Sequence, residues 1–496
     1  MRRTIRVVAV GSLMTLGACA SARPDPDPMS QVRDSKLSTA ARIKAIDRRW
    51  ASASEGARER QAAREDLKTV AGPGAWPAPL RLAAMRALAD DRSEQGEADT
   101  KRLAILMLPR ETDPGMTTLL SGLAAERGWT DATPALVRSL GRWNPRVADT
   151  ERPEAKAIRT LNPDRPLAEV VWGVFVAPPE ERSTLRPVSA ERIRADAWDL
   201  LSRLDPTGDQ RAAWLSTAPE EATGAIADLR ACVRDLRCAP LTGDELRWLG
   251  SLRDFTKPAN RSWWEAATAA VGSTDPERTG RLQLRHIAAI HWAAAHGSPW
   301  LSADRATLLA ELKSKLASRP VHRRVRGERE SRAPSSERLA DVAATISWGD
   351  LLVALVVDKS LGGTRLARTL RAQAEMDRED TSAEYGGLLV ASPPNADPPF
   401  NAVLYPPRPG DRRGDREFVA SADMIAQSDH ALAHYHYHAQ KARNVEYAGP
   451  SQADILYAAR LGRACVVFTS IRADTLNADL YLPGGEVIDL GTVVSP

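Results

Sequence analysis

The spacing of hydrophobic positions changes along the chain. From Leu37 to Ser318, apolar residues recur every three or four positions, the spacing of amphipathic α-helices, and strand-like alternation is nearly absent. One of these helices begins at Ser189, whose side chain suits a helix N-cap. Further helices are predicted over residues 40–50, 57–70, 79–88, 116–125, 132–140, 218–238, 243–254, 260–271, 276–296 and 303–317. Residues 37–318 are therefore predicted to form an all-α helical array.

Residues 339–496 have a different pattern. Helices are predicted over residues 339–361, 364–376 and 451–461. Short strand-like segments occur at residues 387–391, 401–405, 417–420, 431–438, 464–470, 478–482 and 487–490. Gly484 and Gly485 indicate a hairpin turn between the last two strands. Together these elements predict an α+β domain with a mixed sheet, of ordinary domain size.

Two other segments complete the predicted plan. Pro79 to Ala84, with the sequence Pro-Leu-Arg-Leu-Ala-Ala, resembles HEAT-type repeats. The repeats have no fixed period, so the array over 37–318 is expected to be HEAT-like but irregular. Residues 319–338 are polar, basic and bounded by prolines, which is typical of a linker.

The first residues predict export rather than fold. Basic residues precede a short apolar run from Val7 to Leu16, which is too short for a permanent membrane span. The run ends in Leu-Gly-Ala-Cys19, which resembles the bacterial lipobox and implies lipidation of Cys19. The alternative is an ordinary secretory signal that is cleaved near Ala20. The predicted order is thus a lipoprotein signal peptide at 1–19 and a Pro-rich spacer at 20–36.

Composition limits the classes of partner. The chain is 43% hydrophobic and 27% charged, which is ordinary for a globular protein. Its net charge of +4 is small for 496 residues, so nucleic acid is not an expected partner. Cys232 and Cys238 are close in sequence. They either form a disulfide, which requires a helix break between them, or remain two partly buried thiols.

The candidate chemistry lies between residues 384 and 454. Four of the eight histidines, namely His430, His434, His436 and His438, fall within nine residues. Because side chains alternate along a strand, the last three face one side, and two of them can hold one zinc ion. A catalytic zinc site has three protein ligands and a water, and Asp454 in the next helix is a candidate third ligand. Glu384 is a candidate general base.

The three histidines His286, His291 and His296 do not predict a second metal site. They recur every five residues, and five residues rotate a helix by about 140°, so the rings do not converge. They are expected to be surface or packing histidines.

The order Glu-x-Gly-Gly, then His-x-His, then Ser-x-x-Asp resembles the JAMM metallopeptidase family, whose fold is the JAB/MPN domain. The matching residues are Glu384, Gly386, Gly387, His436, His438, Ser451 and Asp454. The resemblance covers about residues 350–496, and within 339–496 it implies a JAB/MPN-like domain. It implies that His436, His438 and Asp454 hold Zn2+, that Glu384 activates water, and that Ser451 stabilises the oxyanion. The pair His434 and His436 is an alternative register, whereas Ser451 and Asp454 alone could be only a helix capping box.

These observations predict a lipid-anchored, extracytoplasmic zinc metallopeptidase of the bacterial cell envelope, on its periplasmic side. Its substrate would be a protein or peptide, cleaved at a peptide or isopeptide bond, and its lipid would place it on a membrane surface. The alternative is a non-catalytic envelope scaffold, in which the helices and a JAMM-like domain serve to bind partners.

Overall fold

The computed structural model describes residues 27–72, 74, 76–179, 188–219, 222–320, 322, 338–414 and 417–493. The predicted signal peptide with Cys19 lies outside these residues, as does most of the predicted linker at 319–338. Part of the predicted spacer is described, and there Pro28–Arg33 forms helix α1, capped by Asp27. Within the described residues, no helix combines the length and the apolar character needed to cross a membrane.

Contacts divide the chain into two compact units, Met1–Ala135 and Leu136–Pro496. The described part of the first unit is helical. After α1 come α2 (Thr39–Ala51), η1 (Ser52–Glu55), α3 (Ala57–Ala71), α4 (Ala78–Ala89), α5 (Glu94–Met107), η2 (Leu108–Arg110), α6 (Pro114–Glu126), η3 (Thr130–Ala132) and the start of α7 (Thr133–Gly141). Buried Arg81 donates to the carbonyl oxygens of Ala71 and Gly72 and pairs with buried Glu111. It thereby satisfies the carboxyl end of α3, where carbonyl groups lack helical partners.

The second unit continues with helices as far as residue 316. They are α8 (Pro153–Leu161), α9 (Leu167–Val176), α10 (Ala190–Leu204), α11 (Asp209–Thr217), α12 (Ala225–Leu236), α13 (Gly243–Leu252), α14 (Pro258–Gly272), α15 (Pro276–Thr279), α16 (Ile287–Ala295) and α17 (Arg305–Leu316), with 3-10 turns η4 (Asp149–Glu151), η5 (Leu284–His286) and η6 (Pro299–Leu301). Ser189 caps α10, as predicted. Two predictions were wrong in extent. The helix expected at 218–238 begins only at Ala225, after Gly224, and the helix expected at 276–296 is broken after Thr279 by Gly280.

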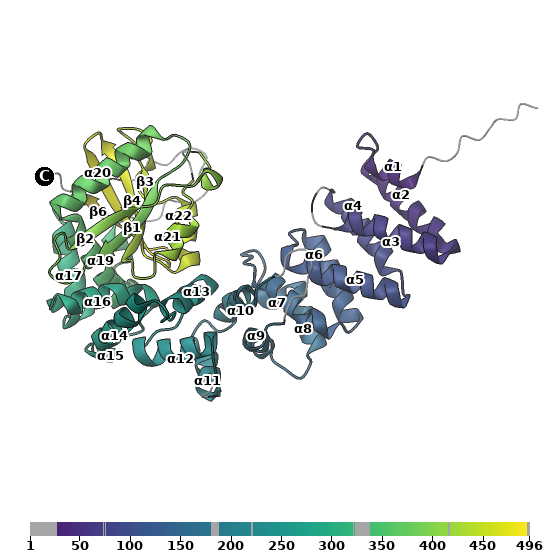
Figure 1. The fold of residues 1–496 in the computed structure, drawn as a ribbon, viewed down its shortest axis with the longest axis horizontal. Helices are drawn as coiled ribbons and strands as arrows, with labels where there is room; N and C mark the ends of the chain where they lie inside the picture. Colours follow the sequence, from purple (N-terminus) through teal and green to yellow (C-terminus); the bar gives the residue numbers. More distant parts are fainter. Residues whose placement is uncertain are drawn as a thin grey trace, which may run out of the picture. The chain divides into compact units, whose positions relative to one another are not determined.

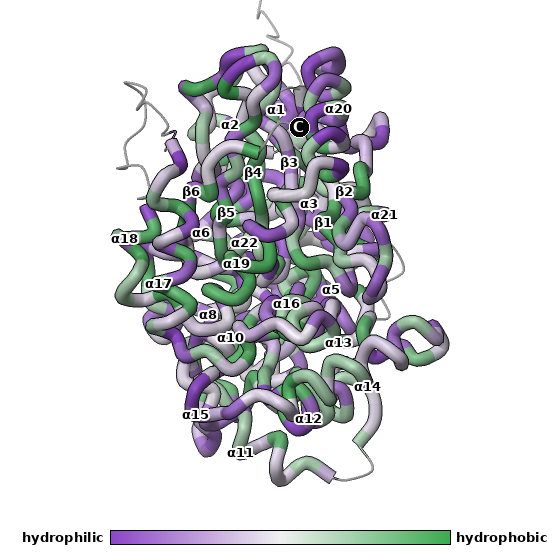
Figure 2. The backbone as a smooth tube through the Cα atoms, turned by 90° about the vertical axis from the view of Figure 1, so that its left-hand side faces the viewer, coloured by the Kyte–Doolittle hydropathy of each residue, from purple (hydrophilic) through white to green (hydrophobic). Residues whose placement is uncertain are grey.

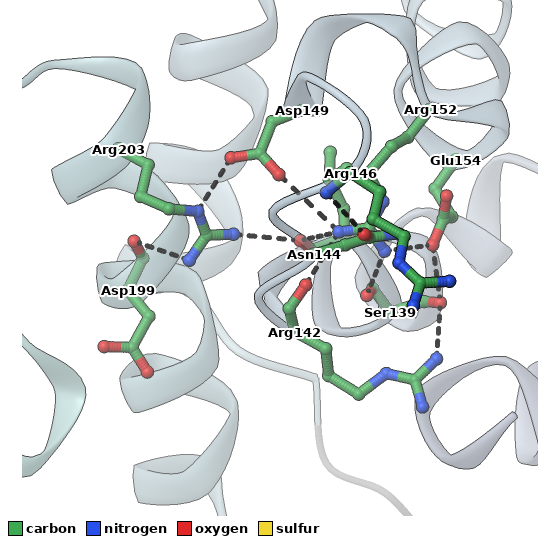
Figure 3. A network of polar contacts seen from close by, with 10 residues as sticks. Ser139, Arg142, Asn144, Arg146, Asp149, Arg152, Glu154, Asp199 and Arg203 are labelled. Carbon is green, nitrogen blue, oxygen red and sulfur yellow. Dashed lines mark hydrogen bonds and ion pairs between the residues drawn. The ribbon is translucent and has the colours of Figure 1, made fainter. Parts of the chain in front are cut away.

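The carboxyl end of α7 is held by arginines (Figure 3). Arg152 donates to the carbonyl oxygens of Ser139 and Leu140 at 2.9 Å each, and to the Glu154 carboxylate at 2.6 Å. Arg203, from α10, donates to the same Leu140 oxygen at 3.0 Å. Guanidinium groups suit this position because the last carbonyls of a helix carry partial negative charge. These contacts fix the turn from α7 to α8 and tie α10 to it.

A contact between Cys232 and Cys238 requires the helix to end between them, and α12 does end there, at Leu236. Arg237 adopts a left-handed conformation with φ 52°, which turns the chain back after Leu236. The two sulfur atoms lie 3.5 Å apart, and both residues are buried free thiols. The hydrogen bond with Cys238, together with burial, raises the pKa of Cys232 well above its usual range.

A six-stranded mixed sheet lies at the carboxyl end of the second unit (Figure 1). Its strands are β1 (Gly386–Ala391), β2 (Phe400–Leu404), β3 (Ala433–His438), β4 (Cys465–Arg472), β5 (Thr475–Tyr481) and β6 (Val487–Thr492), in the order β2-β1-β3-β4-β5-β6. Among the strands of the described residues, only β3 and β4 pair in parallel, and a crossover that contains η8 (Val445–Tyr447) and α22 (Gln452–Leu461) joins them. The all-α array followed by an α+β region with a mixed sheet is confirmed. Residues 417–420, predicted as a strand, pair with no strand among the described residues.

The two faces of the sheet carry different side chains of β3. Tyr435 and Tyr437 point to one face, where both hydroxyls donate to Gln373 of α20 (Thr364–Glu379). The histidines point to the other face, where Ala458 of α22 packs with Cys465 and Val467. Both faces are therefore covered, and every residue of β3 is buried. This burial explains why alternating aromatic and imidazole rings form a core strand here.

The helical region is joined to the sheet region through buried contacts. Helix α18 (Leu339–Val342) contacts β6, and α19 (Trp348–Leu361), which is buried almost all round, contacts α16, α17 and α20 (Figure 2). Trp248 of α13 donates to the Asp429 carbonyl oxygen at 3.0 Å, and the Arg463 guanidinium lies over its ring. Trp263 stacks on His430. Short elements η7 (Pro409–Asp411) and α21 (Ala422–Ala426) complete this region.

Candidate metal centre

Two histidines at the end of β3 form the centre of the candidate site. His436 and His438 lie on the same side of the strand, with ring centroids 5.1 Å apart. His438 Nδ1 is 2.8 Å from the Tyr447 carbonyl oxygen, so it donates its hydrogen there. His436 Nδ1 lies 3.4 Å from the Tyr481 hydroxyl. These contacts fix the rings and direct each Nε2 into the site, which is how metal-binding histidines are usually oriented.

Asp454 reaches both histidines from the first turn of α22. Its Oδ1 lies 3.4 Å from His436 Nε2, and its Oδ2 lies 3.8 Å from His438 Nε2. Helix α22 begins close to the end of β3 because it is the crossover between two parallel strands, and ligand sites commonly form at the carboxyl ends of such strands. Ser451 and Asp454 also form a capping box, with Ser451 N donating to Asp454 Oδ2 at 2.6 Å. Capping and proximity to the histidines therefore occur together.

Glu384 lies just before β1 and is buried. Gln440 donates to its Oε1 at 3.0 Å, and Asn444 in turn donates to Gln440 Oε1 at 2.6 Å. The structure also brings one carboxylate oxygen of Glu384 and one nitrogen each of His436 and His438 within 4.8 Å of one another. Glu384, which precedes β1, thus lies at the same site as the two histidines of β3.

Each of two carboxylates, Asp454 and Glu384, lies beside the two histidines. Zinc bonds of about 2.0–2.2 Å place the ligand atoms of a tetrahedral site about 3.4 Å apart. The distance of 3.4 Å between His436 Nε2 and Asp454 Oδ1 fits that value. One ligand atom each of Glu384, His436 and His438 lies within 4.8 Å of the others, and Asp454 is not part of that group. The structure thus brings two carboxylates, Asp454 and Glu384, next to the same pair of histidines.

The burial, hydrogen bonding and charge of His436 and Asp454 indicate whether this site suits a cation. Among the described residues, His436 Nε2 is buried and makes no hydrogen bond, although it lies near Asp454. Burial alone lowers the pKa of His436, but the carboxylates of Asp454, Glu384 and Asp377 outweigh it and raise the pKa above its usual value. Burial raises the pKa of Asp454, but His436, His438 and Ser451 hold it well below its usual range. Two imidazoles and a carboxylate are a donor set that zinc accepts.

The two glycines after Glu384 are required by close packing. A Cβ atom at Gly386 would lie 2.5 Å from the Tyr435 carbonyl oxygen and would also overlap the Phe418 ring. At Gly387, a Cβ would overlap the Val403 carbonyl oxygen. The Phe418 ring stacks on His436 at 5.1 Å. Glycine therefore lets β1 approach β2 and β3 closely enough to place Glu384 and Phe418 at the histidines.

The remaining histidines lie apart from this cluster. His434 faces the same side of β3, but its Nδ1 is 2.9 Å from the Tyr457 hydroxyl, and it is not in the group that could share an ion. His430 stacks on Trp263, which also lies near His291. His296 stacks on Trp292. His286 is buried and bonded to Asp350 at 3.0 Å, and the backbone N–H of His322 donates to Asp489 at 2.8 Å.

A cavity of about 1080 Å³ opens onto the site, and its lining includes Glu384, His438, Gln440, Asn444, Ser451 and Asp454. Gln440, Asn444 and Tyr447 are contacts that the sequence did not single out, because the loop after His438 has no hydrophobic period. The one feature of the sequence that pointed to them is that they lie between the His-x-His and Ser-x-x-Asp segments. All lining residues come from residues 384–460, so no helix of the array lines this cavity. Comparison with protein-family models, curated proteins and solved structures found no match.

Proposed function

We propose that the protein is a zinc-dependent peptidase of JAMM type, with a JAB/MPN-like domain over 339–496. The observation that carries this proposal is that His436, His438, Asp454 and Glu384 lie together, and that His438, Asp454 and Glu384 also line one cavity. Two histidines, an aspartate and an adjacent carboxylate are the donor set and the base of a hydrolytic zinc site. Zinc, when bound there, would supply Lewis acidity, which polarises a carbonyl group and acidifies water.

The roles of the other residues follow from their contacts. Glu384, oriented by Gln440, would take a proton from the attacking water and pass it to the leaving amine. Ser451 Oγ accepts a hydrogen bond from Asp454 N at 3.3 Å, so its own hydroxyl hydrogen remains available to a developing oxyanion. The substrate class is a peptide or isopeptide bond. This assignment rests on the order of the motif residues, which resembles the JAMM pattern.

We also propose lipid attachment at Cys19 and an extracytoplasmic location at the bacterial envelope. The support is the Leu-Gly-Ala-Cys sequence after a short apolar run. The helices before residue 318 would then form an irregular HEAT-like array that recognises a protein partner or substrate. Mass spectrometry of the protein extracted from membranes tests this part, because a diacyl modification at Cys19 is expected. An unmodified chain that begins after Ala20 would contradict it.

Metal content and hydrolysis, measured together on the full chain, test the proposed activity. The wild type and Glu384→Gln should each contain about one zinc per chain, whereas His436→Ala and Asp454→Ala should lose it. Peptide hydrolysis should require both zinc and Glu384. His430→Ala is the matched histidine control, because His430 lies outside the cluster. Zinc binding without Glu384-dependent hydrolysis would favour the scaffold alternative, and absence of zinc after reconstitution would refute the peptidase.

A further inference from the structure

One side of the cavity beside the metal centre is built from apolar residues. Helix α22 presents Ala453, Leu456, Tyr457 and Arg460 to the cavity. Their spacing of three, four and seven residues is one stripe of a helix. Ile425 of α21 also lines the cavity. Asp454 directly follows Ala453 in the first turn of the same helix, so the stripe begins beside the candidate metal centre.

The inner wall of this cavity is aromatic. Phe418 stacks on His436 at 5.1 Å and meets Tyr457 edge to face at 5.9 Å. Both rings line the cavity. Phe418 thus contacts both His436 and Tyr457, which belongs to the stripe of α22.

The outer wall exposes large apolar side chains. Ile425, Tyr447 and Leu456 are 39%, 49% and 46% exposed, and all three line this one cavity. Ten large hydrophobic residues are exposed in the described part of the chain, so three of them gather here. Apolar side chains scattered singly need no explanation, but a group around a cavity indicates a contact surface.

The charged rim does not oppose an apolar ligand. Arg460 lies 3.5 Å from Asp244, and Lys441 lies 3.7 Å from Glu446, so each cation has an acidic neighbour. Both cations of the lining are thus neutralised by acidic neighbours, and Glu417 is the remaining exposed charge of the lining. What distinguishes this cavity is its apolar wall, together with the donor cluster at its end.

We propose that this wall is a specificity subsite for a bulky apolar side chain of an extended peptide. The inference rests on the proposed peptidase function for the nature of the ligand, because the wall is continuous with the proposed zinc site. The peptide carbonyl that is attacked would lie at His436, His438 and Asp454. The side chain next to it would contact Ile425, Tyr447 and Leu456. Leucine or phenylalanine fits such a wall, whereas a charged side chain would lose its water without gaining a partner.

Peptide binding to the zinc-loaded full chain tests this subsite. The Glu384→Gln variant serves as the receptor, because it should bind zinc without turning the peptide over. The probes are fluorescein-labelled Gly-Ser hexapeptides with a single Leu, Phe, Ala or Glu at the central position. Fluorescence anisotropy should give a Kd for the Leu and Phe peptides about 10- to 100-fold lower than for the Ala peptide, the range that apolar pockets reach. The Glu peptide should bind weakest.

Substitutions connect that preference to the wall. Leu456→Ser and Ile425→Ser, in the same background, should remove most of the difference between the Leu and Ala peptides. Met376→Ser on α20 is the matched control, since Met376 is 47% exposed and lies outside the cavity lining. It should leave the preference intact. Because all three side chains are exposed, the variants should fold, which circular dichroism checks.

The outcomes separate the subsite from the peptidase. Equal affinity for the Leu and Ala peptides, or no binding of any peptide, overturns the subsite. A preference that survives Leu456→Ser and Ile425→Ser also overturns it. Selective binding by Glu384→Gln without hydrolysis by the wild type would keep the subsite and remove the peptidase. Zinc-dependent hydrolysis with no apolar preference would keep the peptidase and remove the subsite.

Discussion

Replacing Asp350 with asparagine should destabilise the second compact unit strongly. Asp350 lies at the start of α19 and receives Arg285 Nε at 2.8 Å and Arg285 Nη2 at 3.1 Å. His286 Nε2 and Ser347 Oγ lie 3.0 and 2.7 Å from its two oxygens. The side chains of Arg285 and Asp350 are each 6% exposed. The pair therefore joins the helical region to the helix that supports the sheet region, away from solvent.

The size of the effect follows from this burial. Asparagine keeps the shape of the side chain, but its NH2 group would face donors of Arg285 or Ser347. Arg285 would remain buried without a counter-charge, and breaking a buried ion pair costs about 3–5 kcal/mol of unfolding free energy. Glu169→Gln is the matched control, because the Arg165–Glu169 pair is about half exposed, at 44% and 45%. Removing an exposed pair costs less than about 1 kcal/mol.

The effect of Asp350→Asn should depend on pH in one direction. Burial raises the pKa of Asp350, but His286 and Arg285 outweigh it and hold the pKa well below its usual range. Burial lowers the pKa of His286, so that ring is neutral at pH 7 and the lasting positive charge is Arg285. A carboxyl whose folded pKa is depressed adds stability above its unfolded pKa of about 3.9, and this contribution is lost as pH falls through the folded value. The difference between wild type and Asp350→Asn should thus be full at pH 7 and should shrink below about pH 4.

Urea unfolding followed by tryptophan fluorescence measures this difference, since most tryptophans lie in the second unit. Wild type, Asp350→Asn and Glu169→Gln should be compared at pH 7 and again near pH 3, where the contribution of Asp350 is being lost. A loss below about 1 kcal/mol at pH 7, equal to that of Glu169→Gln, would refute the reasoning.

Two further substitutions test how the site is built. Gln440→Leu removes the amide that donates to Glu384, so kcat for peptide hydrolysis should fall about 10- to 100-fold, while zinc content and KM stay near wild type. Arg443→Ala, an exposed change in the same loop, should leave kcat unaltered, and a loss of zinc in Gln440→Leu would contradict a positioning role. Gly387→Ala should lower the free energy of unfolding by about 1–3 kcal/mol, because its Cβ overlaps the Val403 carbonyl oxygen. Gly410→Ala, which meets nothing within 4 Å, is its control in thermal unfolding, and equal melting points would show that β1 and β2 can separate at no cost.

The helical and strand patterns were predictable where one period extends over a whole element. Alternation predicted β3 and the common side of its histidines, and Ser189 predicted the start of α10. Predictions from the hydrophobic period were wrong where a turn interrupts the element. Gly280 stops α15, and the predicted helix is resumed only at Ile287 after a 3-10 turn. The segment 417–420 alternates like a strand, but it lines the cavity instead of pairing.

The candidate site was predictable to the extent that its residues belong to regular elements. His436 and His438 share a strand side, and the crossover from β3 to β4 must place the start of α22 near the end of β3. Glu384 reaches the site because β1 pairs with β3 between Gly386 and His436. The loop residues Gln440 and Asn444 could not be placed, because a loop without a period gives no direction to its side chains.

Ser451 and Asp454 show why a capping box and a metal ligand need not be alternatives. Asp454 has two oxygens, and the backbone N–H of Ser451 occupies Oδ2. Its Oδ1 is left to face His436 Nε2 at 3.4 Å. The cap fixes the rotation of the carboxylate, so the helix start that the sequence requires also aims the oxygen at the histidines. A site made in this way needs no additional residue to orient its aspartate, because the first turn of α22 already does so.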